Sequence, residues 1–385
     1  MNFLECVTLN PKVSLEKGKV YPFIEMGNVS TCSRNPNNIE YKSFDSGVKF
    51  EDGDTVIARI TPCLQNGKRF YCKDIGKGFG STEYLVFRPK DNRVDNLYLF
   101  YFMNTDFIKE SMIKSMVGAT GRQRVNNEVF SRLDVDFPDI NTQRRIAAIL
   151  SAYDDLIENN RRQIKLLEEA AQRLYKEWFV DLRFPGWETS PITDGVPEGW
   201  KKGTLGDIAF DAGKNEKKEK RSSYTYYLPI DCLPKKSLAY ISTNDICLAE
   251  SSLVAFKPND ILFGAMRPYF HKVVIARDIG LTRNTCFVIN AKEKTYWSYL
   301  VMLLFSEDTV NYATRISVGT TMPYTRWKDF IQMPAIIPSV DIVTKFGKHF
   351  FPIANKIGYL AELNIKLTEA RDRLLPKLMS GEIEL

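Results

Sequence analysis

Apolar residues recur at alternating spacings of four and three between residues 146 and 178. This repeat is typical of a long helix that packs one seam against a partner helix. The seam consists of Ile146, Leu150, Tyr153, Ile157, Asn160, Ile164, Leu167, Ala171, Leu174 and Trp178. A second seam follows 200 residues later, at Phe346, Phe350, Ile353, Ile357, Leu360, Asn364, Leu367, Arg371, Leu374 and Leu378. The pattern therefore predicts two long helices, each with one asparagine in its apolar seam.

The ends of both helices carry recognisable signals. Asn141 or Thr142 can cap the first helix, and Phe184–Gly186 stops it. Such a helix has roughly 36 residues and a length of about 54 Å. Pro338–Ser339 precedes the second helix. Pro352 lies inside the second seam, where its missing N–H predicts a kink or a restart of the helix.

The segments before each long helix read as mixed short strands and helices. Strand-like segments are rich in β-branched and aromatic residues, and a helix-like segment has aromatic residues on one face. The predicted strands are 55–60 and 84–87 in the first half, and 260–263 and 286–289 in the second. The predicted helices are 97–116 and 297–316.

The two halves of the chain resemble each other along their whole length. The matched segments include Tyr21 with Tyr227, Phe50–Ile57 with Phe256–Phe263, and Val117–Thr120 with Val318–Thr321. Their order is the same in both halves, and the offset stays between 200 and 206 residues. Collinear matches of this kind indicate an internal duplication.

The duplication predicts an α+β chain with two homologous α/β domains and two long helices, related by a pseudo-twofold axis. The helices would pair as an antiparallel coiled coil. The predicted parts are 1–140, 141–185, 186–338 and 339–385. An antiparallel pair centred near residues 162 and 362 places Asn160 opposite Asn364, which would fix the helix register. The alternative is that both asparagines lie at a solvated edge of the seam.

Composition limits the classes of function. Of the 385 residues, 26% are charged and the net charge is +6, which does not favour a general electrostatic coat for DNA. No apolar run is long enough for a membrane helix, and the first residues do not resemble a signal peptide. The seven cysteines are scattered without a C-x-x-C pair. We expect a cytoplasmic protein with reduced thiols and no membrane partner.

Motifs for chemistry are missing from the sequence. His271 and His349 are the only histidines, which excludes a multi-histidine metal site. The sequence has neither a phosphate-binding P-loop nor the Asn/Asp-Pro-Pro-aromatic tetrapeptide with which adenine methyltransferases hold an extruded base. We therefore expect no catalytic residues, no cofactor and no metal in this chain.

Two diverged globular regions on a helical spacer suggest a reader of two unlike DNA sites. Loops with hydrogen-bond donors follow equivalent strands, and glycine-flanked hydroxyl and arginine clusters follow the Val-Gly-x-Thr matches. The predicted contacts of the first region are Arg59, Thr61, Gln65, Lys68, Arg69, Thr120, Arg122, Gln123 and Arg124. Those of the second are Arg267, Tyr269, His271, Lys272, Thr320, Thr321, Tyr324 and Arg326. For each residue the alternative is an ordinary solvated loop side chain.

Three motifs resemble one known family, the specificity (S) subunits of type I restriction–modification systems. They are Pro138–Leu150 with Asp154–Asn160, Pro197–Trp200 with Leu205–Ile208, and Leu374–Ile383. The resemblance extends over essentially the whole chain. The first region departs from it, because it lacks a Pro-Glu-Gly-Trp opening.

This resemblance implies a non-catalytic subunit with two target-recognition domains for an asymmetric bipartite site in double-stranded DNA. Two methyltransferase (M) subunits would bind S-adenosylmethionine, and restriction (R) subunits would use ATP. The outward helix residues Arg161, Arg162, Lys165 and Glu168 would dock the M subunits. The alternative is a coiled-coil protein-interaction module without DNA specificity.

Overall fold

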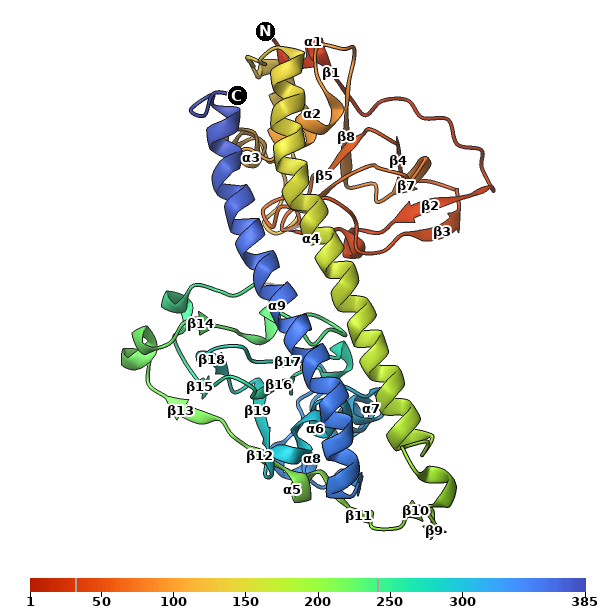
Figure 1. Ribbon diagram of the computed structural model, residues 1–385. Helices are drawn as coiled ribbons and strands as arrows, with labels where there is room; N and C mark the ends of the chain where they lie inside the picture. Colours follow the sequence, from red (N-terminus) through yellow and green to blue (C-terminus); the bar gives the residue numbers. More distant parts are fainter. Residues whose placement is uncertain (32, 241) are drawn as a thin grey trace. The chain divides into compact units, whose positions relative to one another are not determined.

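The computed structural model describes residues 1–385 apart from positions 32 and 241, and it divides into two compact units. Unit 1 consists of Met1–Glu158 and Lys366–Leu385, and unit 2 consists of Asn159–Ile365. The long helices α4 (Ile140–Tyr175) and α9 (Val340–Met379) each contribute one part to each unit (Figure 1). None of the helices described is long and apolar enough to span a membrane.

Unit 1 contains two four-stranded sheets. The first is antiparallel and has the order β1 (Val7–Leu9), β8 (Tyr84–Pro89), β5 (Thr55–Ala58), β6 (Arg69–Tyr71). The second has the order β3 (Glu40–Ser43), β2 (Val20–Ile24), β7 (Lys77–Gly80), β4 (Val48–Glu51), with β2 and β7 parallel. Three further helices are α1 (Phe3–Cys6), α2 (Asn96–Phe102) and α3 (Asp106–Lys114). The predicted strands at 55–60 and 84–87 are thereby confirmed as β5 and β8.

Unit 2 contains two sheets of the same size. The first is antiparallel, in the order β12 (Ala209–Asp211), β19 (Cys286–Ala291), β16 (Ile261–Gly264), β17 (Val273–Ile275). The second has the order β13 (Lys214–Glu216), β15 (Leu253–Phe256), β18 (Gly280–Arg283), β14 (Tyr226–Tyr227). Two small pairs join β9 (Ile192–Thr193) with β10 (Val196–Pro197) and β11 (Lys201–Thr204) with β20 (Pro334–Ile337). The helices are α5 (Leu205–Ile208), α6 (Trp297–Leu304), α7 (Glu307–Ile316) and α8 (Trp327–Phe330).

The sheets of the two units share most of their topology. The parallel pair β2–β7 and the antiparallel neighbour β4 have their counterparts in β14–β18 and β15, whereas the fourth strand lies on the opposite edge. The pairing also corrects one match made from sequence. Phe50 pairs with Gly78, and Phe256 pairs with Gly280. One residue beyond each glycine, the partners are Phe23 and Tyr227, so Tyr227 corresponds to Phe23 and not to Tyr21.

The two shorter helical predictions were each wrong in the same way. Residues 97–116 form α2 and α3, and residues 297–316 form α6 and α7, so each predicted helix is two helices. Ser306 explains the second break, because its side chain accepts a hydrogen bond from the Thr309 N–H and caps α7. The aromatic residues keep a helical spacing across both breaks, so the sequence pattern does not show where the first helix of each pair ends.

The ends and continuity of the long helices also differ from expectation. Asp139, and not Asn141 or Thr142, caps α4, since its carboxylate accepts bonds from both of those backbone N–H groups. The helix α9 continues through Pro352 without a restart. Phe350 and Ile357 are buried on either side of this proline, and their packing outweighs the one hydrogen bond that proline removes.

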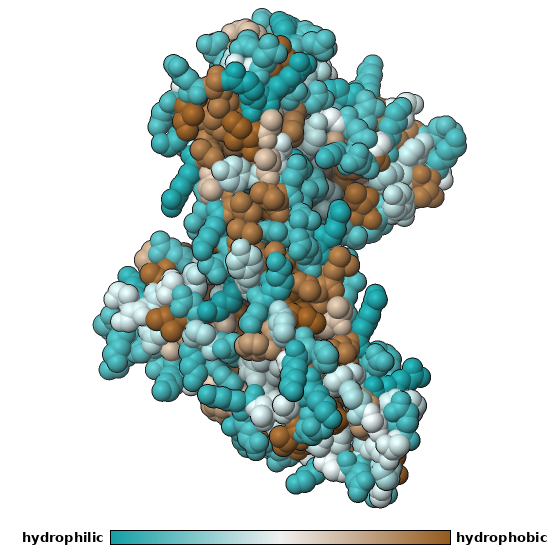
Figure 2. Space-filling view, in the orientation of Figure 1, coloured by the Kyte–Doolittle hydropathy of each residue, from teal (hydrophilic) through white to brown (hydrophobic). Residues whose placement is uncertain are grey.

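Within each unit, the parts of α4 and α9 pack with opposite chain directions. In unit 1, Leu150 shares a core with Leu378, while Asp154 further along α4 bonds Arg371 earlier in α9. In unit 2, the Trp178 ring lies 5.8 Å from that of Phe346, and Asn160 bonds Asn364. Every predicted seam residue is buried or half-buried. Brown apolar patches remain on the surface along these helices (Figure 2).

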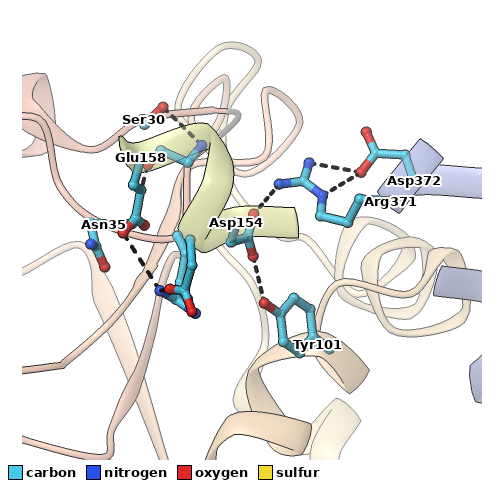
Figure 3. Close-up of polar contacts among 10 residues, drawn as sticks. Ser30, Asn35, Tyr101, Asp154, Glu158, Arg371 and Asp372 are labelled. Atoms are coloured by element: carbon cyan, nitrogen blue, oxygen red, sulfur yellow. Dashed lines mark hydrogen bonds and ion pairs between the residues drawn. The ribbon is translucent and has the colours of Figure 1, made fainter. Parts of the chain in front are cut away.

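A buried ionic cluster joins four segments of unit 1 (Figure 3). Asp154 accepts a hydrogen bond from the Tyr101 hydroxyl at 2.5 Å and an ion pair from Arg371 at 2.5 Å. Arg371 also binds Asp372. Arg34, which is 3% exposed, reaches the same helix through Asp155. The cluster explains why an arginine occupies a position of the apolar seam.

Candidate nucleic-acid interface

Two loops of unit 1 that sequence reasoning selected lie side by side. The loop after β5 begins at Arg59, and the second loop spans residues 117–125. Arg124 connects them, because it forms β-bridges with both Ile60 and Val117. The Thr61 N–H donates to the Gln123 carbonyl at 2.9 Å, and the Gln123 N–H donates to the Thr61 hydroxyl at 3.0 Å. The backbone therefore holds both loops in one surface.

Unit 2 joins its two loops in the same way. Tyr324 forms β-bridges with both Met266 and Val318. The Arg267 N–H donates to the Pro323 carbonyl at 2.7 Å, as Thr61 does to Gln123 in unit 1. Arg267 has a φ of 50°, a left-handed conformation that is costly for a non-glycine residue. Strain of this kind is often found where a side chain must be presented to a ligand.

Eight of the predicted contact residues are exposed at these loops. Gly118 and Gly121 shape the tip in unit 1, since their φ values of 123° and 82° favour glycine. Within the described part of the chain, the Arg122 side chain has no hydrogen-bond or ion-pair partner, so its guanidinium is available to a ligand. The exposed residues are Gln65, Thr120, Arg122 and Arg124 in unit 1, and Tyr269, Thr320, Thr321 and Arg326 in unit 2.

Other predicted contact residues are half-buried and bound to backbone carbonyls. Lys68 donates to the Met26 carbonyl at 2.7 Å, and Lys272 donates to the Ile230 carbonyl at the same distance. Arg59 binds the Val125 carbonyl, and Arg69 binds the Gly67 carbonyl. These four side chains hold the loops in place by binding backbone carbonyls. The sequence alone does not show this role.

Two predicted contact residues lie inside the protein. Thr61 is 8% exposed and bonds the second loop, as described above. His271 is 3% exposed, and its Nε2 lies 3.0 Å from the Phe305 carbonyl. Burial lowers the pKa of His271 below its usual value, despite the nearby Glu307. Both positions are suited to holding the loop, and neither presents its polar atoms to the surface.

Charged pairs occupy two further positions of the loop surface. The Arg124 guanidinium binds both carboxylate oxygens of Glu83, with distances from 2.6 to 3.0 Å. The hydrogen bonds from Arg124 hold the pKa of Glu83 below its usual value, so this carboxyl is ionised at neutral pH. Arg326 forms an ion pair with Asp329 at 2.7 Å. Tyr324, the counterpart of Arg124, donates its hydroxyl to the Asn284 carbonyl at 3.2 Å.

Sequence reasoning missed Glu83 and Arg283. Glu83 immediately precedes β8, and Arg283 ends β18. Both residues lie at strand ends beside the loops, and this position could have identified them from the sequence. Arg283 lines a cavity of about 580 Å³ in unit 2, together with Arg267 and Lys272. This concave, basic surface adjoins the loop pair of unit 2, whereas unit 1 has Ser81 near the corresponding strand end.

Metal and disulfide chemistry find no support in the described residues. They contain no group of three or more His, Cys, Asp or Glu side chains that could hold a metal ion. The six cysteines described are free thiols, and Cys32 lies outside the described residues. The exposed predicted contact residues of the two loop pairs are hydrogen-bond donors and cations.

Comparisons with known proteins agree on one class. Residues 4–169 match the family described as type I restriction modification DNA specificity domain. The MjaIX type I restriction enzyme specificity subunit of Methanocaldococcus jannaschii is 28% identical over 322 residues, which cover 77% of this chain and 71% of that protein. The HindI specificity subunit of Haemophilus influenzae is 23% identical, with 86% of each chain covered. The crystal structure of a type I S subunit from M. genitalium has the same fold, with a TM-score of 0.56, 16% identity, and coverage of 98% of this chain and 95% of that one.

Proposed function

We propose that this chain is a specificity subunit of a type I restriction–modification system and that its two α/β regions read the two halves of an asymmetric bipartite DNA site. The observation that carries the proposal is the pair of loop surfaces. Each unit joins its two loops through one bridging residue, yet the exposed side chains differ. A shared frame with different donors suits two unlike half-sites.

The duplication supports the assignment of one half-site to each unit. Both units place the bridging residue, the lysine that binds a backbone carbonyl and the buried acid at equivalent points. Asp54 and Asp260, for example, both accept a hydrogen bond from the backbone three residues earlier. The antiparallel pairing of α4 and α9 within each unit supports a coiled-coil spacer, which would set the gap between the half-sites.

The contact with DNA centres on the exposed donors of each loop pair. Arg122 and Gln65 act in the first half-site, and Tyr269 and Thr321 act in the second. Arginine suits guanine edges and phosphates, and glutamine suits adenine. Four of the predicted contact residues hold the loops in place instead of contacting bases. They are Lys68, Lys272, Thr61 and His271.

Partner subunits supply the chemistry. Two M subunits carry S-adenosylmethionine and methylate adenine, and R subunits add ATP-dependent cleavage, while the present chain selects the sequence. Exposed apolar residues on the long helices, including Leu166 and Phe351, offer docking surfaces. Glu168 does not belong to such a surface, because it is 6% exposed and accepts hydrogen bonds from the Ser237 hydroxyl and the Leu238 N–H.

A coiled-coil interaction module without DNA specificity is the less favoured function. It would account for the long helices, but it would not account for two similar loop frames with different exposed donors.

Co-expression with the methyltransferase from the neighbouring reading frame tests the proposed function. Sequencing that maps methylated adenines should give two short, unlike sequences separated by a constant gap. A stable complex that methylates without sequence preference would contradict the proposal.

A further inference from the structure

The ion pair between Glu83 and Arg124 is a distinct feature of the loop surface of unit 1. It lies where the two loops meet, and Arg124 is held there by both backbone and side chain. Its N–H and carbonyl exchange hydrogen bonds with Val117 at 2.9 Å each. Its side chain remains 48% exposed although it binds Glu83. The guanidinium is thus fixed in place while part of it still faces solvent.

The carboxylate occupies only one edge of the guanidinium. Glu83 accepts hydrogen bonds from Nε and Nη2 of Arg124. Among the described residues, Nη1 of Arg124 has no hydrogen-bond partner, and Nη2 retains a second hydrogen. The remaining Nη1–Nη2 fork can therefore donate two parallel hydrogen bonds to one ligand.

Glu83 itself is firmly placed. The Arg59 N–H donates to its carbonyl at 2.9 Å, and its own N–H donates to the Ser81 hydroxyl at 3.1 Å. The next residue, Tyr84, is 1% exposed and begins β8. A carboxylate on such a rigid strand end can orient an arginine without moving with it.

Stability alone does not account for this pair. An ion pair between partly exposed side chains stabilises a protein by about 1 kcal/mol or less. A carboxylate on a surface that faces DNA also repels phosphates. Unit 2 has Thr285 and Tyr324 at the equivalent positions, so the shared loop frame forms without any charged pair there.

We propose that Arg124 reads one guanine in the half-site bound by unit 1 and that Glu83 is the positioning residue that aims it. This inference rests on the proposed function. Guanine presents O6 and N7 as two adjacent acceptors in the major groove, and a bidentate arginine is their best-matched partner. Arg122, which has no partner within the described residues, contacts a phosphate and contributes affinity without selecting a base.

The test is methylation mapping of the intact complex with three variants of the full chain. Arg124→Lys should relax one guanine position in a single half-site, lowering discrimination there by roughly 5- to 150-fold. Glu83→Gln should relax the same position by a smaller factor. Arg122→Ala should reduce methylation evenly at all positions of the motif. Thermal unfolding of each variant should match that of the wild type.

The outcomes separate this inference from the proposed function. If the wild type yields a bipartite motif but Arg124→Lys and Glu83→Gln leave every base preference unchanged, the inference is wrong and the proposed function stands. The inference also fails if the relaxed position is not a guanine. If the wild type shows no motif at all, the proposed function itself fails.

Discussion

Asn160 donates its side-chain Nδ2–H to the Oδ1 of Asn364 at 2.9 Å, and both residues are at most 5% exposed. One comes from α4 and the other from α9, and apolar seam residues flank both. Sliding either helix by one turn would bury each amide against hydrocarbon. The pair therefore favours one register, at the cost of leaving the Asn364 Nδ2 unpaired among the described residues.

Removing one asparagine should cost more than removing both. Asn160→Ala leaves the buried Asn364 amide without its partner, which should lower the free energy of unfolding by about 1–3 kcal/mol. The double variant Asn160→Leu, Asn364→Leu should be at least as stable as the wild type, because neither polar group is then buried. Urea unfolding of the full chain measures both. Equal losses from the single and double variants would contradict the proposed register pair.

The buried ion pair between Asp154 and Arg371 predicts a larger effect. Asp154→Ala would leave Arg371 buried with Asp372 alone, and breaking such a pair typically costs about 3–5 kcal/mol. A matched control is Glu169→Ala on the same helix, which should be tolerated better because its partner Arg173 is 84% exposed and lies 3.9 Å away. Comparing their urea midpoints distinguishes the two positions. Similar midpoints would show that the buried cluster adds little stability.

Glu168 predicts a pH-dependent stability of unit 2. Burial raises the pKa of Glu168 from 4.5 to about 7, although Ser237 and Leu238 donate hydrogen bonds to the carboxylate. The folded state therefore binds a proton more tightly than the unfolded state, so stability should fall as pH rises from about 4.5 to about 7. Glu168→Gln keeps an acceptor without the charge and should flatten this fall.

Stability measured at pH 4 and pH 8 tests that expectation. The variant should equal the wild type at pH 4 and exceed it at pH 8 by up to a few kcal/mol, since one pKa unit corresponds to about 1.4 kcal/mol. A pH profile that is the same in both proteins would rule out this role for Glu168.

Arg122 predicts a loss of DNA affinity without a loss of stability. Arg122→Ala removes an exposed donor that contacts a phosphate, so it should weaken binding of all sequences evenly and lower the slope of log affinity against log salt concentration by about 1. Arg132→Ala is a suitable control, because that side chain is 81% exposed outside the two loops. Titrations at two salt concentrations measure both. Equal binding by the two variants would remove Arg122 from the interface.

Much of the fold could be predicted from periodicity. The seam spacing located both long helices, because burial along a helix repeats every three or four residues regardless of the rest of the protein. The same arithmetic placed Asn160 opposite Asn364. Capping was less predictable, since Asp139, Asn141 and Thr142 are all good capping residues and only the chain path selects among them.

The candidate site was predicted at the level of segments and not of side chains. The sequence identified both loops in each half, but it could not separate Arg122, which is exposed, from Lys68, which binds the Met26 carbonyl. The two cations look alike in the sequence because their difference depends on backbone groups 42 residues away. Glu83 was missed for the same reason, since its partner Arg124 is 41 residues away.

The most direct test is to map the methylated motif for two loop variants side by side. One variant carries Gln65→Ala in unit 1, and the other carries Tyr269→Ala and Thr321→Ala in unit 2. We predict that each variant weakens selection in one half of the motif only, and in opposite halves, while the gap stays constant. If either variant altered both halves equally, or neither half, the assignment of one half-site to each unit would be contradicted.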